Sequence, residues 1–245
     1  MFPQLYHAQH AGYVEDLDFW QELVSYDNKP ILELGCGTGR VTLRLAEHGS
    51  LVFGLDNDFE MLTFLKNNIT EELKPFVRCI QADMTLFRLA LLFRYILLPC
   101  NTYSTFLATQ RLSILATLRR HLLPGGFFVV SLPNPIRLAS LQSQGYTEIE
   151  DVFPHPIDHE PVQVSNTWQR ANDIFTLYWH YDHLLPTGEV KRHSFQNIHY
   201  LTSIEQYLNE FRGAGFDIID LYGDFNYSRY EPDSPHLIAK VRWPN

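Results

Sequence analysis

The chain has few cysteines and little positive charge, and each shortage excludes a class of protein. Its three cysteines (Cys36, Cys79 and Cys100) are far apart in 245 residues. This usage fits the reduced thiols of a cytoplasmic protein better than a disulfide framework or a thiolate metal site. The 19 Lys and Arg residues face 28 Asp and Glu, for a net charge of −9. That balance argues against an extended surface for nucleic acid or anionic membranes.

Long hydrophobic runs are also missing. The first residues lack the basic segment and apolar core of a signal peptide. The most apolar stretch, 89–100, is too short to span a bilayer and contains Arg94. Hydrophobic residues nevertheless make up 45% of the chain, which is typical of globular proteins. We therefore expect a soluble, cytoplasmic protein that does not contact membranes.

Short apolar segments alternate with amphipathic ones through the first 133 residues. The apolar segments show no polar alternation, as expected of parallel strands buried on both faces. The pattern predicts an α/β fold with a doubly wound, mostly parallel sheet. A helix is also expected at 13–24, and the sheet is completed by two late strands, the last at its antiparallel edge. The seven predicted strands are 31–34, 51–56, 76–83, 94–100, 127–133, 216–223 and 236–243, with helices at 41–48, 60–68, 111–121 and 203–214.

Residues 134–200 interrupt this alternation. The segment 134–154 has no regular pattern, whereas 162–170, 174–185 and 189–201 alternate like strands. We predict an antiparallel insertion of three strands over the main sheet. The expected domains are thus a core of 1–133 and 201–245, in which 1–28 form a helical cover, and a roof of 134–200.

A glycine-rich turn follows the first predicted strand. Gly35, Gly37 and Gly39 leave the backbone bare at the start of a helix, where a ligand can approach N–H groups. Nicotinamide sites use the spacing G-x-G-x-x-G, whereas this turn has G-x-G-x-G. The preceding Glu33 would repel a pyrophosphate and attract an ammonium group. These features make an NAD(P)-dependent oxidoreductase a disfavoured alternative.

Two further acids end the second and third predicted strands. Asp56 stands where a carboxylate can accept hydrogen bonds from ribose hydroxyls, and Asp83 could accept one from an adenine amino group. The ligand so described has an ammonium group, a ribose and an adenine but no phosphate, as S-adenosylmethionine (SAM) has. Simpler alternatives remain open: Asp56 and Asp83 as helix or turn caps, and Arg40 as a solvated residue rather than a partner of the SAM carboxylate.

The segments "ELGCGTGR", "GLDND", "QADM" and "HLLPGG" resemble those of the class I SAM-dependent methyltransferases. The layout of the insertion resembles that of sugar N-methyltransferases and relatives of glycine N-methyltransferase. The resemblance implies SAM as cofactor, a roof over an acceptor pocket, and an N-terminal segment that places Tyr6 or Tyr13 near the methionine end. The predicted cofactor-binding residues are Glu33, Gly35, Cys36, Gly37, Gly39, Arg40, Asp56, Asn57, Met61, Asp83, Met84, Pro99, Asn101 and Tyr13.

The loop "LPCNTYSTF" at 98–106 is where the family places the methyl group and the acceptor. Asn101, Tyr103 and Ser104 could orient a nucleophile there. Sugar N-methyltransferases often have a histidine late in this loop, where this chain has Phe106, so no general base is assigned. The catalytic candidates are Tyr103, His155, His159 and His180.

The insertion also raises the question of a metal or an aromatic pocket. His180 and His183 are three residues apart on a predicted strand and so point to opposite faces; no metal site is expected. Four aromatic residues favour either packing of the insertion or a pocket for a planar or cationic acceptor. These are Trp168, Tyr178, Trp179 and Tyr181.

The expected function is methyl transfer from SAM to N or O of a small-molecule acceptor by in-line displacement. Three alternatives remain: a SAM-binding protein with other or lost activity, the oxidoreductase, and a protein methyltransferase. Nucleic acid is not an expected partner, because the Asn/Asp-Pro-Pro-aromatic motif of many base N-methyltransferases is absent from 99–106. A homodimer is compatible with the sequence.

Overall fold

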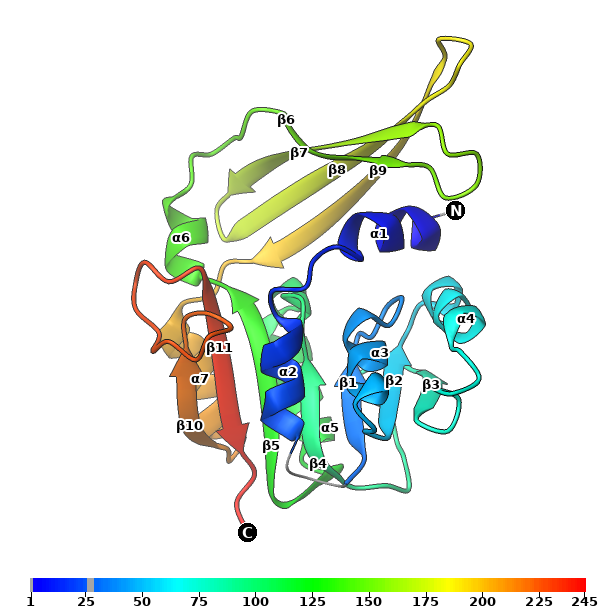
Figure 1. Cartoon of the computed structure of the whole chain (residues 1–245). Coiled ribbons are helices and arrows are strands. Elements are labelled where there is room, and N and C mark those ends of the chain that lie inside the picture. The colour runs from blue at the N-terminus through cyan, green and yellow to red at the C-terminus, as the bar shows by residue number, and fades with distance from the viewer. Residues whose placement is uncertain (1, 26–28) are drawn as a thin grey trace.

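A computed structural model of the chain describes residues 2–25 and 29–245. It contains two sheets, one above the other, in Figure 1. The larger sheet has seven strands in the order β10-β11-β5-β4-β1-β2-β3. Its strands are β1 (Ile31–Leu34), β2 (Val52–Asp56), β3 (Val77–Gln81), β4 (Phe93–Leu98), β5 (Leu122–Pro133), β10 (Asp217–Tyr222) and β11 (His236–Arg242). The predicted seven-stranded, mostly parallel sheet is confirmed.

The last strand, however, does not lie at the edge of the sheet. β11 pairs antiparallel with both β10 and β5, so β10 is the edge strand and the edge prediction for 236–243 was wrong. The reason is visible in the burial of β11, in which Leu237, Ile238 and Ala239 are all fully buried. A run without exposed positions indicates a strand covered on both faces.

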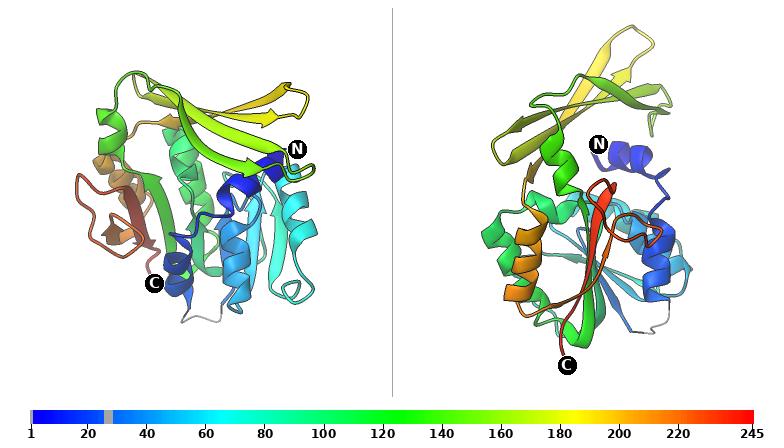
Figure 2. Two further views of the ribbon diagram at one scale, coloured as in Figure 1. Left: turned by 45° about the horizontal axis from the view of Figure 1, so that its top comes forward. Right: turned by 90° about the vertical axis from the view of Figure 1, so that its left-hand side faces the viewer.

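Helices cover both faces of this sheet, as Figure 2 shows. Alternate residues of one strand therefore enter two different cores. Ile31 packs with α2 and α3, whereas Leu32 belongs to the core beneath α5 and α7. These helices are α2 (Leu17–Val24), α3 (Arg40–Glu47), α4 (Phe59–Asn68), α5 (Ala108–Leu118) and α7 (Ile204–Gly213).

The N-terminal segment differs from its prediction. The helix expected at 13–24 begins only at Leu17, and a separate helix, α1 (Phe2–His10), precedes it. α1 lies between the two sheets in Figure 1. Its Phe2 ring lies 3.9 Å from that of Phe195, and Leu5 is buried beside Tyr181 of the upper sheet. No helix of the described residues is long and apolar enough to cross a membrane.

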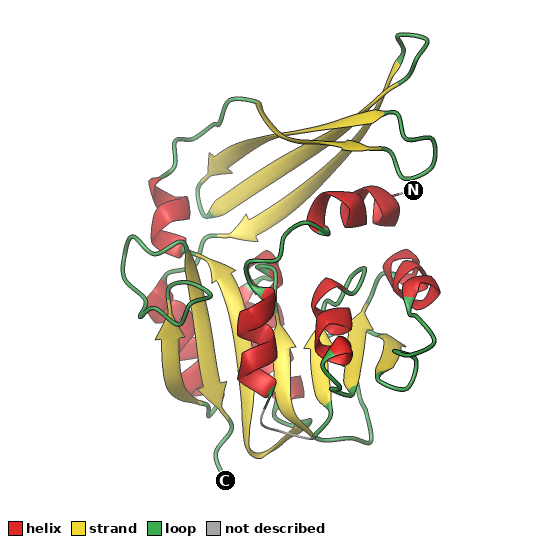
Figure 3. Ribbon diagram, in the orientation of Figure 1, coloured by secondary structure: helices red, strands yellow, loops and turns green. Residues whose placement is uncertain are grey.

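The insertion contains four strands rather than three. They form an antiparallel sheet in the order β6-β7-β8-β9, drawn in yellow above the core in Figure 3. The segment expected to be irregular, 134–154, holds a short helix and the extra strand β6. β6 was missed because it is an edge strand with almost every residue exposed, so it has no alternation of apolar residues. The elements are α6 (Pro135–Ser140), β6 (Glu148–Pro154), β7 (Pro161–Ala171), β8 (Ile174–Leu184) and β9 (Val190–Tyr200).

Candidate cofactor and acceptor sites

The glycine turn between β1 and α3 has left-handed backbone at all three glycines. The φ angles of Gly35, Gly37 and Gly39 are +65°, +52° and +91°, a region that strains other residues. A Cβ added at Gly37 would meet no atom within 4 Å, so this peptide is open to a ligand. A Cβ on Gly39 would lie 2.3 Å from Leu65 Cδ1. Gly39 is therefore required by the packing of α3 against α4.

A buried carboxylate lies beneath this turn. Glu33 is only 3% exposed, and the Thr42 hydroxyl donates a hydrogen bond to it. Burial raises the pKa of Glu33 to about 8, and the hydrogen bond from Thr42 only partly opposes this effect. Because ionising a buried carboxylate without a partner is unfavourable, a cationic ligand beside it stabilises the ionised form strongly. The ammonium group of SAM fits this requirement.

Asp56 connects the end of β2 to the same turn. Its Oδ2 accepts the Gly37 N–H at 2.8 Å, and its Oδ1 accepts the Asp58 N–H at 2.9 Å. Asp58, not Asp56, caps α4 by accepting the N–H of Glu60 and Met61, so the capping alternative for Asp56 was wrong. Each Asp56 oxygen keeps a lone pair, so a hydroxyl donor such as ribose fits beside the turn.

The N-terminal segment closes over the turn. Arg40, at the start of α3, donates to the Tyr13 carbonyl at 2.9 Å and pairs with the Asp16 carboxylate at 2.8 Å. This internal ion pair replaces the interpretation of Arg40 as a solvated residue, whereas its contact with the SAM carboxylate stays a prediction. The ion pair ties the connection between α1 and α2 to α3. From α1 itself, Tyr6 and His10 line the cavity at the glycine turn.

A second, larger cavity of about 510 Å³ lies between the core and the four-stranded sheet. Five residues line both cavities, so the two adjoin: Tyr6, His10, Arg40, Cys100 and Asn197. Apart from Gln196, the roof consists of residues spaced by two on adjacent strands, which places them on one face of the sheet. They are Leu177, Trp179 and Tyr181 on β8 and Phe195, Asn197 and His199 on β9.

Comparison with known proteins agrees with this geometry. Residues 31–126 match a family described as a methyltransferase domain. The chain is similar to a carboxy-S-adenosyl-L-methionine synthase of Pseudomonas aeruginosa (strain UCBPP-PA14), with 30% identity over 176 residues, 61% of this chain and 70% of that protein. The chain belongs to the class I SAM-dependent methyltransferases. Its cofactor is SAM.

Two solved methyltransferases share the fold. One is a SAM-dependent methyltransferase from Clostridium acetobutylicum ATCC 824, with a TM-score of 0.81, 19% identity and coverage of 100% of this chain and 98% of that chain. The other is SAM-bound CalS10, an amino pentose methyltransferase from Micromonospora echinaspora, with a TM-score of 0.74, 19% identity and coverage of 98% and 97%. Because the likeness extends over nearly the whole chain, it includes the insertion as well as the core.

The methyltransferase brings only part of the predicted cofactor set to the cavity at the turn. Glu33, Gly35, Cys36, Gly37 and Arg40 line it. Tyr13 and Asn101 line the larger cavity instead. Asp83 accepts the N–H and hydroxyl of Thr85, both at 2.7 Å, and so caps a local turn. The remaining predicted residues line neither cavity, although Asp56 bonds to the turn: Gly39, Asp56, Asn57, Met61, Asp83, Met84 and Pro99.

None of the four predicted catalytic candidates lines either cavity. Tyr103 is fully buried in the core beneath α7, with its ring 5.9 Å from that of Phe211. His180 bonds to Ser194 at 2.8 Å and has the opposite parity to the roof residues of β8, so it faces away from the cavity. His155 and His159 belong to the turn between β6 and β7. The structure thus places none of the four candidates at either cavity.

The same turn contains a cluster that the sequence did not predict. His155 and His183 stack with ring centroids 3.9 Å apart and planes 13° apart. Their ring nitrogens lie 2.9 and 3.1 Å from one oxygen of Asp158. The donor atoms of the three residues lie within 4.8 Å of one another, a grouping that could hold a metal ion. In this arrangement the two imidazoles share one carboxylate oxygen.

Proposed function

We propose that this methyltransferase transfers the methyl group of SAM to N or O of a small molecule held in the cavity under the roof. The observation that carries the proposal is that the cavity at the glycine turn adjoins this larger one. An in-line displacement needs the acceptor, the methyl carbon and the sulfur on one line, and fixing that geometry contributes about 7–11 kcal/mol to such reactions. Adjoining cavities would hold the two molecules next to each other, which this alignment requires.

The cofactor would be held by the residues at the turn. In this proposal Glu33 accepts hydrogen bonds from the ammonium group, Asp56 binds the ribose hydroxyls, and the backbone at Gly35 and Gly37 lies against the ligand. Bound SAM supplies an electrophilic methyl group on a sulfonium. The described residues do the rest: they orient both molecules and exclude water. We expect Glu33→Ala and Asp56→Ala each to weaken SAM binding without unfolding the sheet.

The position of the larger cavity, between the roof and the core, supports a small acceptor over a protein substrate. Its roof is largely aromatic and apolar, with Trp179, Tyr181 and Phe195 on adjacent strands. Trp168, in contrast, packs on the backbone of Gly145, where an added Cβ would lie 2.3 Å from the indole. The aromatic residues of the insertion thus divide between pocket and packing. The proposed domain roles follow: 134–200 roof the acceptor, and the core holds SAM.

The test is turnover with purified protein, SAM and a panel of small aromatic amines and alcohols. Formation of S-adenosylhomocysteine together with a methylated acceptor is expected. Trp179→Ala should raise the KM for the acceptor, whereas Tyr178→Ala, on the same strand but away from the cavity, should not. Mass spectrometry of the adenosyl product excludes the chemistry named for the Pseudomonas relative, because carboxy-SAM is heavier than SAM. SAM binding without turnover of any acceptor would contradict the proposal.

A further inference from the structure

A histidine of the roof contacts the loop that follows β4. His199, near the end of β9, has its Nδ1 2.8 Å from the Ser104 hydroxyl oxygen, and both side chains are buried. Ser104 lies in a short 3₁₀ helix, Thr102–Thr105, directly after Asn101. His199 and Asn101 both line the larger cavity. An imidazole from the insertion thus reaches the loop that follows β4.

The hydrogen bonds around Ser104 determine which nitrogen of His199 carries the proton. The Ser104 hydroxyl has one proton, and it donates this proton to the Asn101 carbonyl oxygen at 2.7 Å. In the hydrogen bond between the two side chains, the Nδ1–H of His199 must then be the donor and the Ser104 hydroxyl oxygen the acceptor. A neutral imidazole carries a single N–H, so Nε2 has a free lone pair. Because Nδ1 is held by Ser104 and the ring lines the cavity, this lone pair is available to a ligand there.

The charge state of His199 is consistent with such a role. Burial lowers the pKa of His199 to about 4, and no charged neighbour contributes to this shift. The imidazole is therefore neutral and ready to accept a proton at physiological pH. Asp16 is the one carboxylate among the described residues that line the cavity, and it is paired with Arg40. Nε2 of His199 thus has no ionised acid competing for the acceptor's proton.

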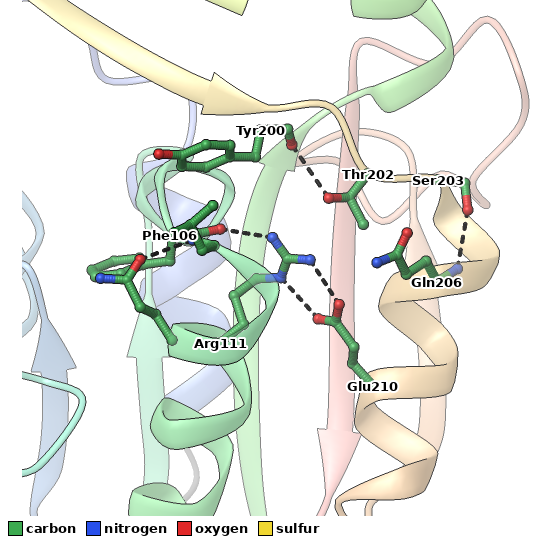
Figure 4. A network of polar contacts seen from close by, with 9 residues as sticks. Phe106, Arg111, Tyr200, Thr202, Ser203, Gln206 and Glu210 are labelled. Atoms are coloured by element: carbon green, nitrogen blue, oxygen red, sulfur yellow. Dashed lines mark hydrogen bonds and ion pairs between the residues drawn. The ribbon is translucent and has the colours of Figure 1, made fainter. Parts of the chain in front are cut away.

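A buried ion pair holds the two sides of this contact together (Figure 4). Arg111 of α5 donates to the Phe106 carbonyl at 2.7 Å and forms two hydrogen bonds with Glu210 of α7, at 2.8 and 2.7 Å. Phe106 ends the loop that carries Ser104. The ion pair thus ties this loop to α7, the helix that follows β9 in the chain.

From this geometry we infer that Nε2 of His199 takes the proton of a hydroxyl acceptor during methyl transfer, with Ser104 as the residue that fixes its tautomer. This inference rests on the proposed function and names its acceptor atom as oxygen. A lone pair of the hydroxyl oxygen forms the bond to the methyl carbon. The bond from that carbon to sulfur breaks, and its electron pair stays on sulfur, giving S-adenosylhomocysteine. The hydroxyl proton passes to Nε2, and the imidazolium then releases it to water.

The strength of the base decides between oxygen and an alkyl amine. A weak base suffices for a hydroxyl, because its oxygen becomes strongly acidic as the new bond to carbon forms. An alkyl amine behaves differently: with a pKa near 10, as in lysine, it is protonated at pH 7, and a weakly basic imidazole does not take the proton that nitrogen must lose before it can attack. It would also bind as a cation, and among the described residues the cavity offers no carboxylate that is not already paired.

Tyramine tests the acceptor atom, because it carries a phenol and an alkyl amine in one molecule. With wild-type protein and SAM, the expected product is the O-methyl compound, with p-cresol methylated and benzylamine not. Methylation of tyramine and benzylamine on nitrogen would overturn the oxygen assignment while leaving the proposed function in place. If the protein binds SAM but forms no S-adenosylhomocysteine with any of these probes, the proposed function is overturned, and this role of His199 with it.

Variants test the histidine itself. His199→Gln should lower kcat by about 10²- to 10⁴-fold with unchanged SAM affinity, and added imidazole should restore turnover to His199→Ala. His193→Gln, on the same strand but not lining the cavity, is the matched control. Nitrogen NMR of histidine-labelled protein adds a measurement that needs no acceptor. It should show His199 protonated on Nδ1 alone, and Ser104→Ala should mix the tautomers. Protonation on Nε2, or full activity of His199→Gln, would refute the assignment.

Discussion

Replacing Glu33 by glutamine should make the protein more stable and a poorer binder of SAM. Glu33 is fully buried under the glycine turn, and burial raises its pKa to about 8 from an ordinary value of 4.5. Between these two values the folded protein holds a proton that the unfolded chain has released. Wild-type stability therefore falls as the pH rises through this window, by about 1.4 kcal/mol per pH unit. Glutamine has nearly the same shape as glutamate but does not ionise, so the variant should lose this dependence of stability on pH.

The size of this stability difference at pH 7 follows from the gap between pH 7 and the pKa of Glu33 in the unfolded chain. That gap of 2.5 pH units (7 − 4.5) corresponds to about 3 kcal/mol in favour of Glu33→Gln. The new amide leaves N–H donors in a buried site, at a cost of about 1 kcal/mol that does not depend on pH. In a chain of this length 1 kcal/mol shifts Tm by about 2–4 °C. A rise of several degrees is expected at pH 7, and none at pH 4.

Urea unfolding and thermal scans across pH 4–9 measure this difference, and calorimetry measures the cost in function. SAM binding to wild type at pH 7 should release most of one proton, detected by titration in two buffers of different ionisation enthalpy. The variant should release none and should bind more weakly. A stability difference that stays constant with pH, or wild-type SAM affinity in Glu33→Gln, would refute the reasoning.

Three further changes test other parts of the site. Asp56→Asn should weaken SAM binding by about 10- to 100-fold in calorimetry, because hydrogen bonds to a charged group are worth about 1.5–3 kcal/mol. Gly39→Ala should destabilise the fold by at least about 1–2 kcal/mol in urea, since its φ is +91° and the new methyl would meet Leu65. Arg111→Met should cost about 3–5 kcal/mol by leaving Glu210 as an unpaired buried charge, and combining it with Glu210→Gln should recover much of that loss.

Much of the core could be predicted because its signals are local. β1 and β2 are continuous apolar runs, and the glycines of the turn are adjacent to Glu33 in sequence. The missed elements lack such signals. Only Pro3 and Leu5 of α1 are buried. The residues that pack against Leu5 belong to the four-stranded sheet, which lies far away in the sequence. β6 pairs along one edge and exposes nearly every side chain, so nothing in its composition distinguishes it from a loop.

The site divides in the same way. Glu33 and Asp56 follow from where their strands end, whereas the partners of Arg40 and Ser104 are 24 and 95 residues away. No spacing rule connects such pairs. The choice of His180 as a candidate, although it lies away from the cavity, has a different cause: the alternation of β8 was recognised, but alternation alone does not say which face meets the core. The structure settles this, since the residues at 177, 179 and 181 face the cavity.

The two ligands therefore depend on different layers of the protein. In the proposed function, SAM meets a turn whose conformation is set by glycines and by acids at strand ends, where most changes would also disturb the sheet. The proposed acceptor site uses side chains on one face of β8 and β9, where a residue can change without altering the backbone pairing behind it. Asn197 is the roof residue that lines both cavities. Acceptor preference can thus change at Leu177, Trp179 or Phe195 while cofactor binding is retained, which explains why a strong cofactor motif says so little about the acceptor.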